Sequence, residues 1–146
     1  MSTDQNKELI RRGFEEGINK RNLAYFEESI GENYVNHSMP APSPGPEGFK
    51  QVIGMFVAGF PDIQITLEDV IGDGDRVCTR GFWRGTHTGE FMGIPATGRK
   101  IEIPYMDMWR IENGKAVENW VQMDMMMMMH QLGLMPEEMA DEENEG

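Results

Sequence analysis

Residues 105–124 read YMDMWRIENGKAVENWVQMD, and this stretch predicts a β-hairpin. Residues 105–112 alternate in polarity and are rich in strand formers, and residues 115–124 return with similar residues. Asn113 and Gly114 between them favour a type I′ turn, because both tolerate a positive φ. The hairpin therefore puts the end of the chain in an antiparallel sheet.

Strand side chains alternate between two faces, so the hairpin sorts its residues into sets. Two sets of three share a face on their own strands: Tyr105, Asp107 and Trp109 on the first, and Trp120, Gln122 and Asp124 on the second. If both sets point inward, two carboxylates lie among aromatic rings. Lost hydration and a neighbouring carboxylate both raise the pKa of an aspartate, so Asp107 and Asp124 are candidate general acid/base groups.

Each aspartate also has a structural interpretation. Asp107 can pair with an arginine of a neighbouring strand. Asp124 can cap the helix that the following residues predict. Both interpretations stay open, because a strand face is easily misassigned by one residue.

Upstream of the hairpin, helical periodicity gives way to strand periodicity. The expected elements are helices over residues 4–20, 22–30 and 47–60 and strands over residues 63–67 and 76–86. This order is that of an α+β domain in which three N-terminal helices pack on a curved, mostly antiparallel sheet, with a cavity at the open end. Seven residues are expected to meet across the core: Phe14, Phe26, Phe56, Phe60, Val77, Trp83 and Trp120.

The chain has 146 residues, the size of one domain, and a formal net charge of -12. Residues 137–146 hold six acids and no base, which leaves -6 for residues 1–136. We therefore expect one folded domain over residues 1–136 and a disordered acidic tail over residues 137–146. The sequence offers no basic stripe for nucleic acid, and an acidic surface is repelled by anionic membranes.

The cysteine content and the lengths of the apolar runs indicate the cellular compartment of the protein. Cys78 is the single cysteine, which excludes an intrachain disulfide. The first twenty residues contain no uninterrupted apolar stretch, so we expect no signal peptide, and no later run reaches membrane-spanning length. We expect a cytoplasmic protein.

His37 is the strongest candidate for proton transfer outside the hairpin. It lies where the second expected helix gives way to a proline-rich loop, and the pKa of histidine is near working pH. A solvated or hydrogen-bonded structural histidine is the alternative. His37, His87 and His130 lack the spacing of a metal site, so we expect no metal.

Tryptophan and methionine have mainly structural interpretations. Trp83, Trp109 and Trp120 lie on predicted strands, where they can pack in the core or stack against a flat ligand. The five methionines 125–129 predict a short apolar helix that ends near Gly133 and Pro136 rather than a metal site.

Several separated motifs agree in order and spacing. They are GTHTGEFMGIPATG at 85–98, WRIENGK at 109–115, ENWVQMD at 118–124 and QLG at 131–133, with Tyr34-Val-Asn-His37 and Phe60-Pro-Asp62 upstream. Over about residues 5–135 the chain thereby resembles the SnoaL-like polyketide cyclases, also called ester cyclases.

The resemblance implies a nuclear-transport-factor-2-like cone with a deep apolar pocket and no cofactor. The founding activity of the family is the aldol condensation that closes the last ring of an anthracycline precursor ester. By position, Asp124 corresponds to the catalytic acid/base and His37 to the pocket histidine, whereas Asp107 stands where the cyclases carry a histidine. The residues expected to contact a small aromatic substrate are Tyr34, Asn36, Phe56, Phe60, Trp83, Tyr105, Trp109 and Trp120.

The outer face of the sheet bears on assembly. Met106 and Met108 alternate opposite to Asp107 and make that face apolar, so together with the resemblance they favour a homodimer.

Other functions use the same cone. Limonene epoxide hydrolases resemble it and activate water with an aspartate, arginine, aspartate set. Asp107 and Asp124 could supply the acids, with Tyr34 and Asn36 holding the water, but Tyr105 stands where the arginine is expected. Some relatives hydroxylate polyketides, and other proteins of this fold bind without catalysis.

Overall fold

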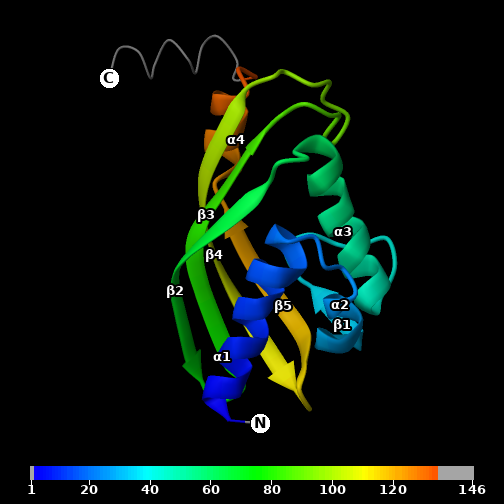
Figure 1. Cartoon of the computed structure of the whole chain (residues 1–146), viewed down its shortest axis with the longest axis vertical. Helices are drawn as coiled ribbons and strands as arrows, with labels where there is room; N and C mark the ends of the chain where they lie inside the picture. Colours follow the sequence, from blue (N-terminus) through cyan, green and yellow to red (C-terminus); the bar gives the residue numbers. More distant parts are fainter. Residues whose placement is uncertain (1, 135–146) are drawn as a thin grey trace.

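The computed structural model describes residues 2–134, which form four α-helices and a five-stranded sheet (Figure 1). The helical elements are α1 (Thr3–Arg12), the π-helical segment η1 (Gly13–Asn19), α2 (Tyr25–Ser29), α3 (Gly45–Gly59) and α4 (Met125–Gln131). The strands are β1 (Ile30–Asn36), β2 (Gln64–Asp73), β3 (Arg76–Thr86), β4 (Lys100–Glu112) and β5 (Lys115–Met123). The expected tail over residues 137–146 and the helix end at Pro136 lie outside the described residues.

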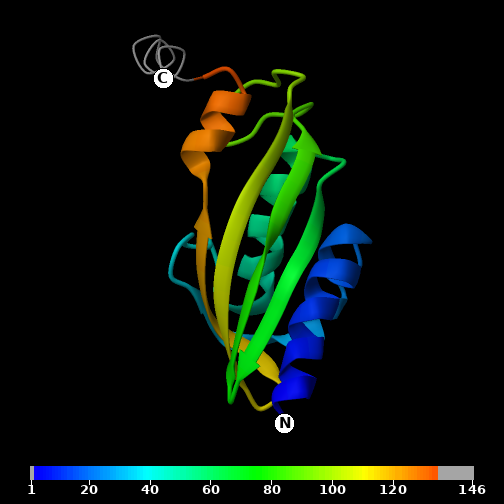
Figure 2. The same ribbon diagram turned by 90° about the vertical axis from the view of Figure 1, so that its left-hand side faces the viewer.

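The sheet has the strand order β1-β5-β4-β3-β2. Its three neighbouring pairs from β5 to β2 are antiparallel, and β1 pairs with β5 in parallel. Figure 2 views the curved sheet from its uncovered side, with α3 behind it. The predicted α+β architecture is confirmed, and residues 2–134 contain four α-helices, of which α4 is the short helix predicted from the five methionines. No helix in this part of the chain is long and apolar enough to cross a membrane.

Strand β1 was not predicted, because its residues lack a two-residue period. Ile30, Gly31 and Tyr34 are buried, while the positions between Gly31 and Tyr34 are exposed. The pairing with β5 also shifts register between Ile30 and Val35. Ile30 therefore reads from the sequence as the last buried residue of the preceding helix.

The hairpin forms at the predicted turn. Asn113 has φ 53° and Gly114 has φ 76°, as a type I′ turn requires. Past the turn, Ile111 pairs with Ala116 but Arg110 pairs with Glu118, so Val117 is an extra residue in β5. This β-bulge reverses the faces of β5 relative to the simple pattern.

As a result, the predicted inward face of β5 is wrong. Asn119, Val121 and Met123 pair with the inward residues of β4, which are Trp109, Asp107 and Tyr105. Trp120 instead pairs with Met108, and Gln122 pairs with Met106, on the outer face.

α1 and η1 follow each other without a break and form one continuous helix. Ser2 caps α1 through a reciprocal capping box with Gln5. Gly17 lies in η1 directly against Phe26, where an added Cβ would come within 2.4 Å of the ring. This glycine is therefore required by close packing against α2.

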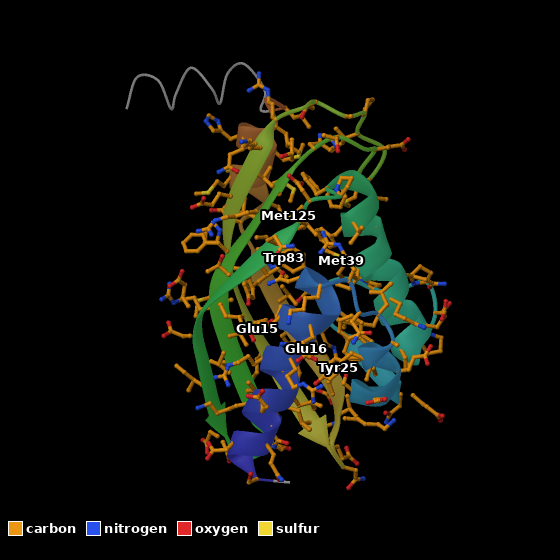
Figure 3. The ribbon with its side chains drawn as sticks, viewed as in Figure 1. Glu15, Glu16, Tyr25, Met39, Trp83 and Met125 are labelled. Atoms are coloured by element: carbon orange, nitrogen blue, oxygen red, sulfur yellow. The ribbon has the colours of Figure 1, made fainter. Side chains whose placement is uncertain are left out.

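Six of the seven expected core residues are buried, and Trp120 is the exception. The six are Phe14, Phe26, Phe56, Phe60, Val77 and Trp83. Figure 3 shows Met39, Trp83 and Met125 close to the upper part of the space between the sheet and α3. This space holds the cavity described next.

Candidate active site

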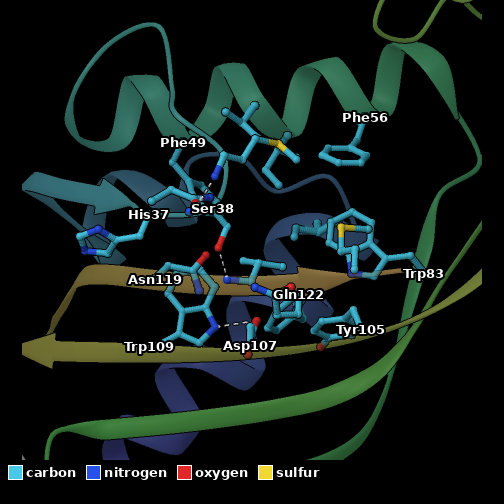
Figure 4. A pocket seen from close by; sticks show the side chains of 18 of the residues that line it. His37, Ser38, Phe49, Phe56, Trp83, Tyr105, Asp107, Trp109, Asn119 and Gln122 are labelled. Atoms are coloured by element: carbon cyan, nitrogen blue, oxygen red, sulfur yellow. Dashed lines mark hydrogen bonds between the residues drawn. The ribbon is translucent and has the colours of Figure 1, made fainter. Parts of the chain in front are cut away.

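A cavity of about 400 Å³ lies between the sheet, η1 and α3 (Figure 4). Six aromatic side chains line it: Phe14, Phe49, Phe56, Trp83, Tyr105 and Trp109. Its rim consists of the exposed lining residues His37, Ser38 and Gln122. The cavity has the size and apolar character of a small-molecule site.

Asp107 is the carboxylate among the described residues that line this cavity, and its residue is only 8% exposed. Its Oδ1 accepts hydrogen bonds from the Thr79 backbone N–H at 3.1 Å and from the Thr79 hydroxyl at 2.6 Å. Its Oδ2 accepts one from Trp109 Nε1 at 2.9 Å. The bonds fix the carboxyl group in one orientation on the cavity wall.

Burial raises the pKa of Asp107 from 3.8 to about 7. Removal from water is the largest cause, because it disfavours the charged form. The hydrogen bonds from Thr79 and Trp109 lower the pKa and offset only part of that effect. Both protonation states of Asp107 are therefore populated near neutral pH, as general acid/base catalysis requires.

Trp109 donates a hydrogen bond to the Asp107 carboxyl group and packs against three aromatic side chains. Its ring stacks on Tyr34 at a centroid distance of 6.3 Å and meets Phe14 and Phe49 edge-on or nearly so. Tyr34 is buried behind Trp109 and is not one of the cavity-lining residues. Its contribution to the site is to hold Trp109 in place.

Asp124 lies outside the cavity, so the expected pair of neighbouring carboxylates is not formed. The bulge at Val117 places its strand neighbours Trp120 and Gln122 on the outer face. Asp124 is exposed and caps α4, with Oδ1 accepting from the Met127 backbone N–H at 2.9 Å. The structural interpretation of Asp124 as a helix cap is therefore the one that the geometry supports.

His37 sits at the rim with its imidazole turned toward the outer surface (Figure 4). Its ring stacks on Trp120 at 4.8 Å, and its Nε2 lies 3.6 Å from Glu118 Oε2. The side chain is 43% exposed. These contacts separate His37 from Asp107 and place Trp120 on the surface, away from the expected substrate position.

Asn36 shapes the loop at the rim. Its Oδ1 accepts from the backbone N–H groups of Ser38 and Met39, both at 2.9 Å, which turns the chain out of β1. The Ser38 hydroxyl then accepts from the Val121 backbone N–H at 2.8 Å. The loop that follows β1 is thus tied to β5 beside the cavity.

The remaining expected contacts divide into two groups. Phe56, Trp83 and Tyr105 line the cavity. Phe60 is fully buried elsewhere, between Phe91 and the ring of His87.

Several residues of the site were not predicted. Thr79 could have been found, because strand alternation places it on the inward face of β3, directly paired with Asp107. Asn119 could not, because the bulge that turns it inward has no clear sequence signal. Its Nδ2 donates to the Met108 carbonyl at 3.1 Å, which holds its side chain at the cavity wall.

The described residues contain no group of three or more histidine, cysteine, aspartate or glutamate side chains able to hold a metal ion. The cavity wall itself combines one carboxylate with aromatic and amide groups, a set suited to an uncharged organic ligand.

Comparison with known proteins gives the family. The family model for SnoaL-like polyketide cyclases matches residues 8–132. IdmH from Streptomyces antibioticus, a proposed polyketide cyclase, is 36% identical with a TM-score of 0.76, covering 88% of this chain and 99% of that one. AclR from Streptomyces galilaeus, a proposed hydroxylase, is 26% identical with a TM-score of 0.80, covering 92% of this chain and 100% of that one.

TsrD from Streptomyces laurentii shares the fold at a TM-score of 0.84 and 24% identity, covering 92% of this chain and 99% of that one. Among proteins with curated functions, none matches. The match of the family model over most of the chain, on the nuclear-transport-factor-2-like fold described above, shows that this chain belongs to the SnoaL-like polyketide cyclase family.

Proposed function

We propose that the protein closes a ring in a polyketide-like aromatic ester by an intramolecular aldol reaction, with Asp107 as the general acid/base. The observation that carries this proposal is the buried Asp107 carboxyl group, held by three hydrogen bonds in an aromatic cavity with a pKa of about 7. A group with this pKa can remove and return a proton at neutral pH.

The reaction needs only one such group. The Asp107 carboxylate takes a proton from a carbon that adjacent carbonyl groups make acidic, and the resulting carbanion attacks a second carbonyl carbon of the same molecule. A carbon–carbon bond forms, and the carbonyl oxygen takes the proton back from Asp107 to become an alcohol. The conjugated substrate spreads the negative charge, while the cavity fixes the two reacting carbons together.

Aromatic side chains supply the orientation. Phe56, Trp83, Tyr105 and Trp109 surround the cavity and can stack on a flat ring system. Asn36 shapes the rim through its loop. The catalytic roles expected for Asp124 and His37 are not part of the proposal, because both side chains are directed to the outer surface.

A hydrolase of the limonene epoxide type fits the cavity less well. That chemistry uses two acids and an arginine, whereas the described cavity-lining residues include Asp107 as their only acid and no arginine. Tyr105 occupies the position expected for the arginine and bonds to Thr79 instead. Hydroxylation is the second candidate, favoured by the likeness to AclR.

The deciding experiment compares Asp107→Asn with the matched control Asp124→Asn on an anthraquinone-type polyketide ester. Asparagine keeps the size of the side chain but cannot exchange the proton, so Asp107→Asn should reduce turnover by about 10² to 10⁴. Asp124→Asn should leave turnover unchanged, since asparagine is an equally good helix cap. Turnover is followed by chromatography and mass spectrometry of the product.

Each alternative has its own result. Full turnover by Asp107→Asn would contradict the catalytic assignment. A product heavier than the substrate by one oxygen atom would indicate hydroxylation, because ring closure by an aldol reaction leaves the mass unchanged. Binding without turnover, unaffected by Asp107→Asn, would indicate a non-catalytic binding protein.

We also propose that the protein forms a homodimer through the outer face of the sheet. Met106 is 60% exposed and Met108 38% exposed on β4, and Ile71 of β2 is 63% exposed. Met108 lies in register between Cys78 and Trp120, and Ile71 pairs with Cys78, so these four side chains form one row across the outer face. The Arg76 guanidinium lies against Met108 and over the Trp120 ring in this row. An apolar patch on an otherwise acidic chain is typical of a subunit contact.

Light scattering at micromolar concentration tests the dimer. The wild type should have the mass of a dimer, and Met106→Lys should raise the dissociation constant by on the order of 10- to 100-fold, because it places two like charges in the contact. Met92→Lys, which adds the same charge at a residue that is 62% exposed on a distant loop, is the control and should remain dimeric. A monomeric wild type would contradict the proposal.

A further inference from the structure

The two oxygens of Asp107 have different surroundings. Oδ1 accepts two hydrogen bonds, from the Thr79 backbone N–H and from the Thr79 hydroxyl. A carboxylate oxygen has two acceptor sites, so Oδ1 is fully occupied. Oδ2 accepts one bond among the described residues, from Trp109, and keeps a second acceptor site.

The direction of the hydroxyl chain follows from proton counting. Thr79 has one hydroxyl proton, and that proton lies toward Asp107 Oδ1 in a 2.6 Å bond. The Thr79 oxygen also lies 2.8 Å from the Tyr105 hydroxyl oxygen, so Tyr105 must be the donor in that bond. Tyr105 donates to Thr79, and Thr79 donates to Asp107.

This direction makes protonation at Oδ1 costly. A proton on Oδ1 would be donated to the Thr79 oxygen, and the Thr79 proton would lose Asp107 as its acceptor. Either that proton is left without a partner, or it turns toward the Tyr105 oxygen and the Tyr105 proton loses Thr79 as its acceptor. Thr79 and Tyr105 are each 2% exposed. An unpartnered buried donor is destabilising, so the reversed chain is disfavoured.

We propose that Thr79 and Tyr105 are positioning residues that close Oδ1 of Asp107 and leave Oδ2 as the atom that exchanges a proton with the substrate. The inference rests on the proposed acid/base function and specifies the atom that carries it out. Tyr105 lines the cavity but is not a second point of proton exchange, because a proton held on Oδ2 cannot pass through Oδ1 and Thr79 to reach it.

The groups around Asp107 allow its titration to be measured without interference. Its titratable neighbours are Tyr34 on β1, Cys78 on β3 and Tyr105 on β4, whose pKa values are all affected by its charge. Removal from water is the main cause that raises each of these pKa values, so the three groups stay neutral while Asp107 titrates.

The experiment follows the Asp107 carboxyl carbon by ¹³C NMR as a function of pH in the full-length protein, with Asp107→Asn used to assign the resonance. Thr79→Val removes the hydroxyl donor but keeps the backbone donor and the branched shape. It should raise the titration midpoint by about one pH unit, the effect of one charged hydrogen bond. Thr79→Ser keeps the hydroxyl and should restore the wild-type midpoint.

Tyr105→Phe provides the independent test if Thr79→Val does not fold. Without the Tyr105 hydroxyl, Thr79 no longer accepts a hydrogen bond and is a weaker donor to Oδ1, which disfavours the carboxylate form. The midpoint should therefore rise, by less than in Thr79→Val. An unchanged midpoint in either variant, or a shifted midpoint in Thr79→Ser, would overturn the inference.

The readout separates this inference from the proposed function. The carboxyl titration is measured without substrate, so it reports on Thr79 and Tyr105 whether or not the protein catalyses the aldol reaction. Failure of the proposed function would appear as full turnover in Asp107→Asn, with the effects of Thr79→Val on the titration intact.

Discussion

Asp107 and Asp124 lie on the same hairpin, one on β4 and the other at the end of β5, yet their surroundings differ completely. Asp107 is buried, accepts bonds from two side chains and one backbone N–H, and has a pKa near 7. Asp124 is exposed and bonds to the first turn of α4. The two aspartates therefore have the same chemistry in isolation and different uses in the fold.

The difference follows from one extra residue. Val117 in the bulge shifts the register of the residues that follow it in β5 by one position. Asn119 and Val121 therefore pair with Trp109 and Asp107 and lie beside them on the cavity wall. Asp124 then continues the series of outward-facing residues of β5 and caps α4. A local irregularity of the backbone, rather than the type of residue, decides which carboxyl group reaches the cavity.

The stability of the protein should depend on pH through Asp107 and not through Asp124. The pKa of Asp107 is raised on folding, so the folded state binds its proton more tightly than the unfolded state. Its contribution is fully present below about pH 4 and is lost as the pH rises to about 7. Between pH 5 and 8 the wild type should lose about 2 to 3 kcal/mol of unfolding free energy more than Asp107→Asn.

Urea denaturation at several pH values measures this loss. Asp124→Asn is the control. Its unfolding free energy should vary with pH as in the wild type, because the residue it changes is exposed and outside the cavity. If wild type and Asp107→Asn had the same pH dependence of stability, the raised pKa of Asp107 would be disproved, and the reason for preferring it to Asp124 would disappear.

Much of the fold could be predicted because its signals are local. Asn113-Gly114 determines the turn, and the alternation from Arg76 to Thr86 determines β3. The same alternation places Thr79 and Trp83 on the inward face of the structure. β1 escaped prediction because it is a short strand at the sheet edge, whose pairing with β5 brings together residues about 85 positions apart. Such pairing leaves no periodic pattern in its own seven residues.

The site was harder to predict than the fold, because small displacements decide it. Asp107 was placed correctly, since β4 pairs with β3 in unbroken register from Arg110 to Lys100. The faces predicted for Trp120 and Gln122 were wrong, because the bulge at Val117 comes before them in β5. The hydrogen bonds of Thr79 and Trp109 to one carboxyl group depend on distances in three dimensions that spacing along the chain cannot give.

Asp124 should contribute to stability as the N-cap of α4. Asp124→Ala removes the side chain that accepts from the Met127 N–H at the start of α4, so it should lower the unfolding free energy by about 1 kcal/mol. Asp124→Ser keeps a capping oxygen and should lose much less. Neither variant should change turnover, because α4 stays anchored by the buried Met128 and Leu132. Urea denaturation and the polyketide-ester assay, run on the same preparations, check both statements. Loss of turnover at unchanged stability in Asp124→Ala would show that Asp124 takes part in the reaction. Asp124, rather than Asp107, would then be the candidate general acid/base.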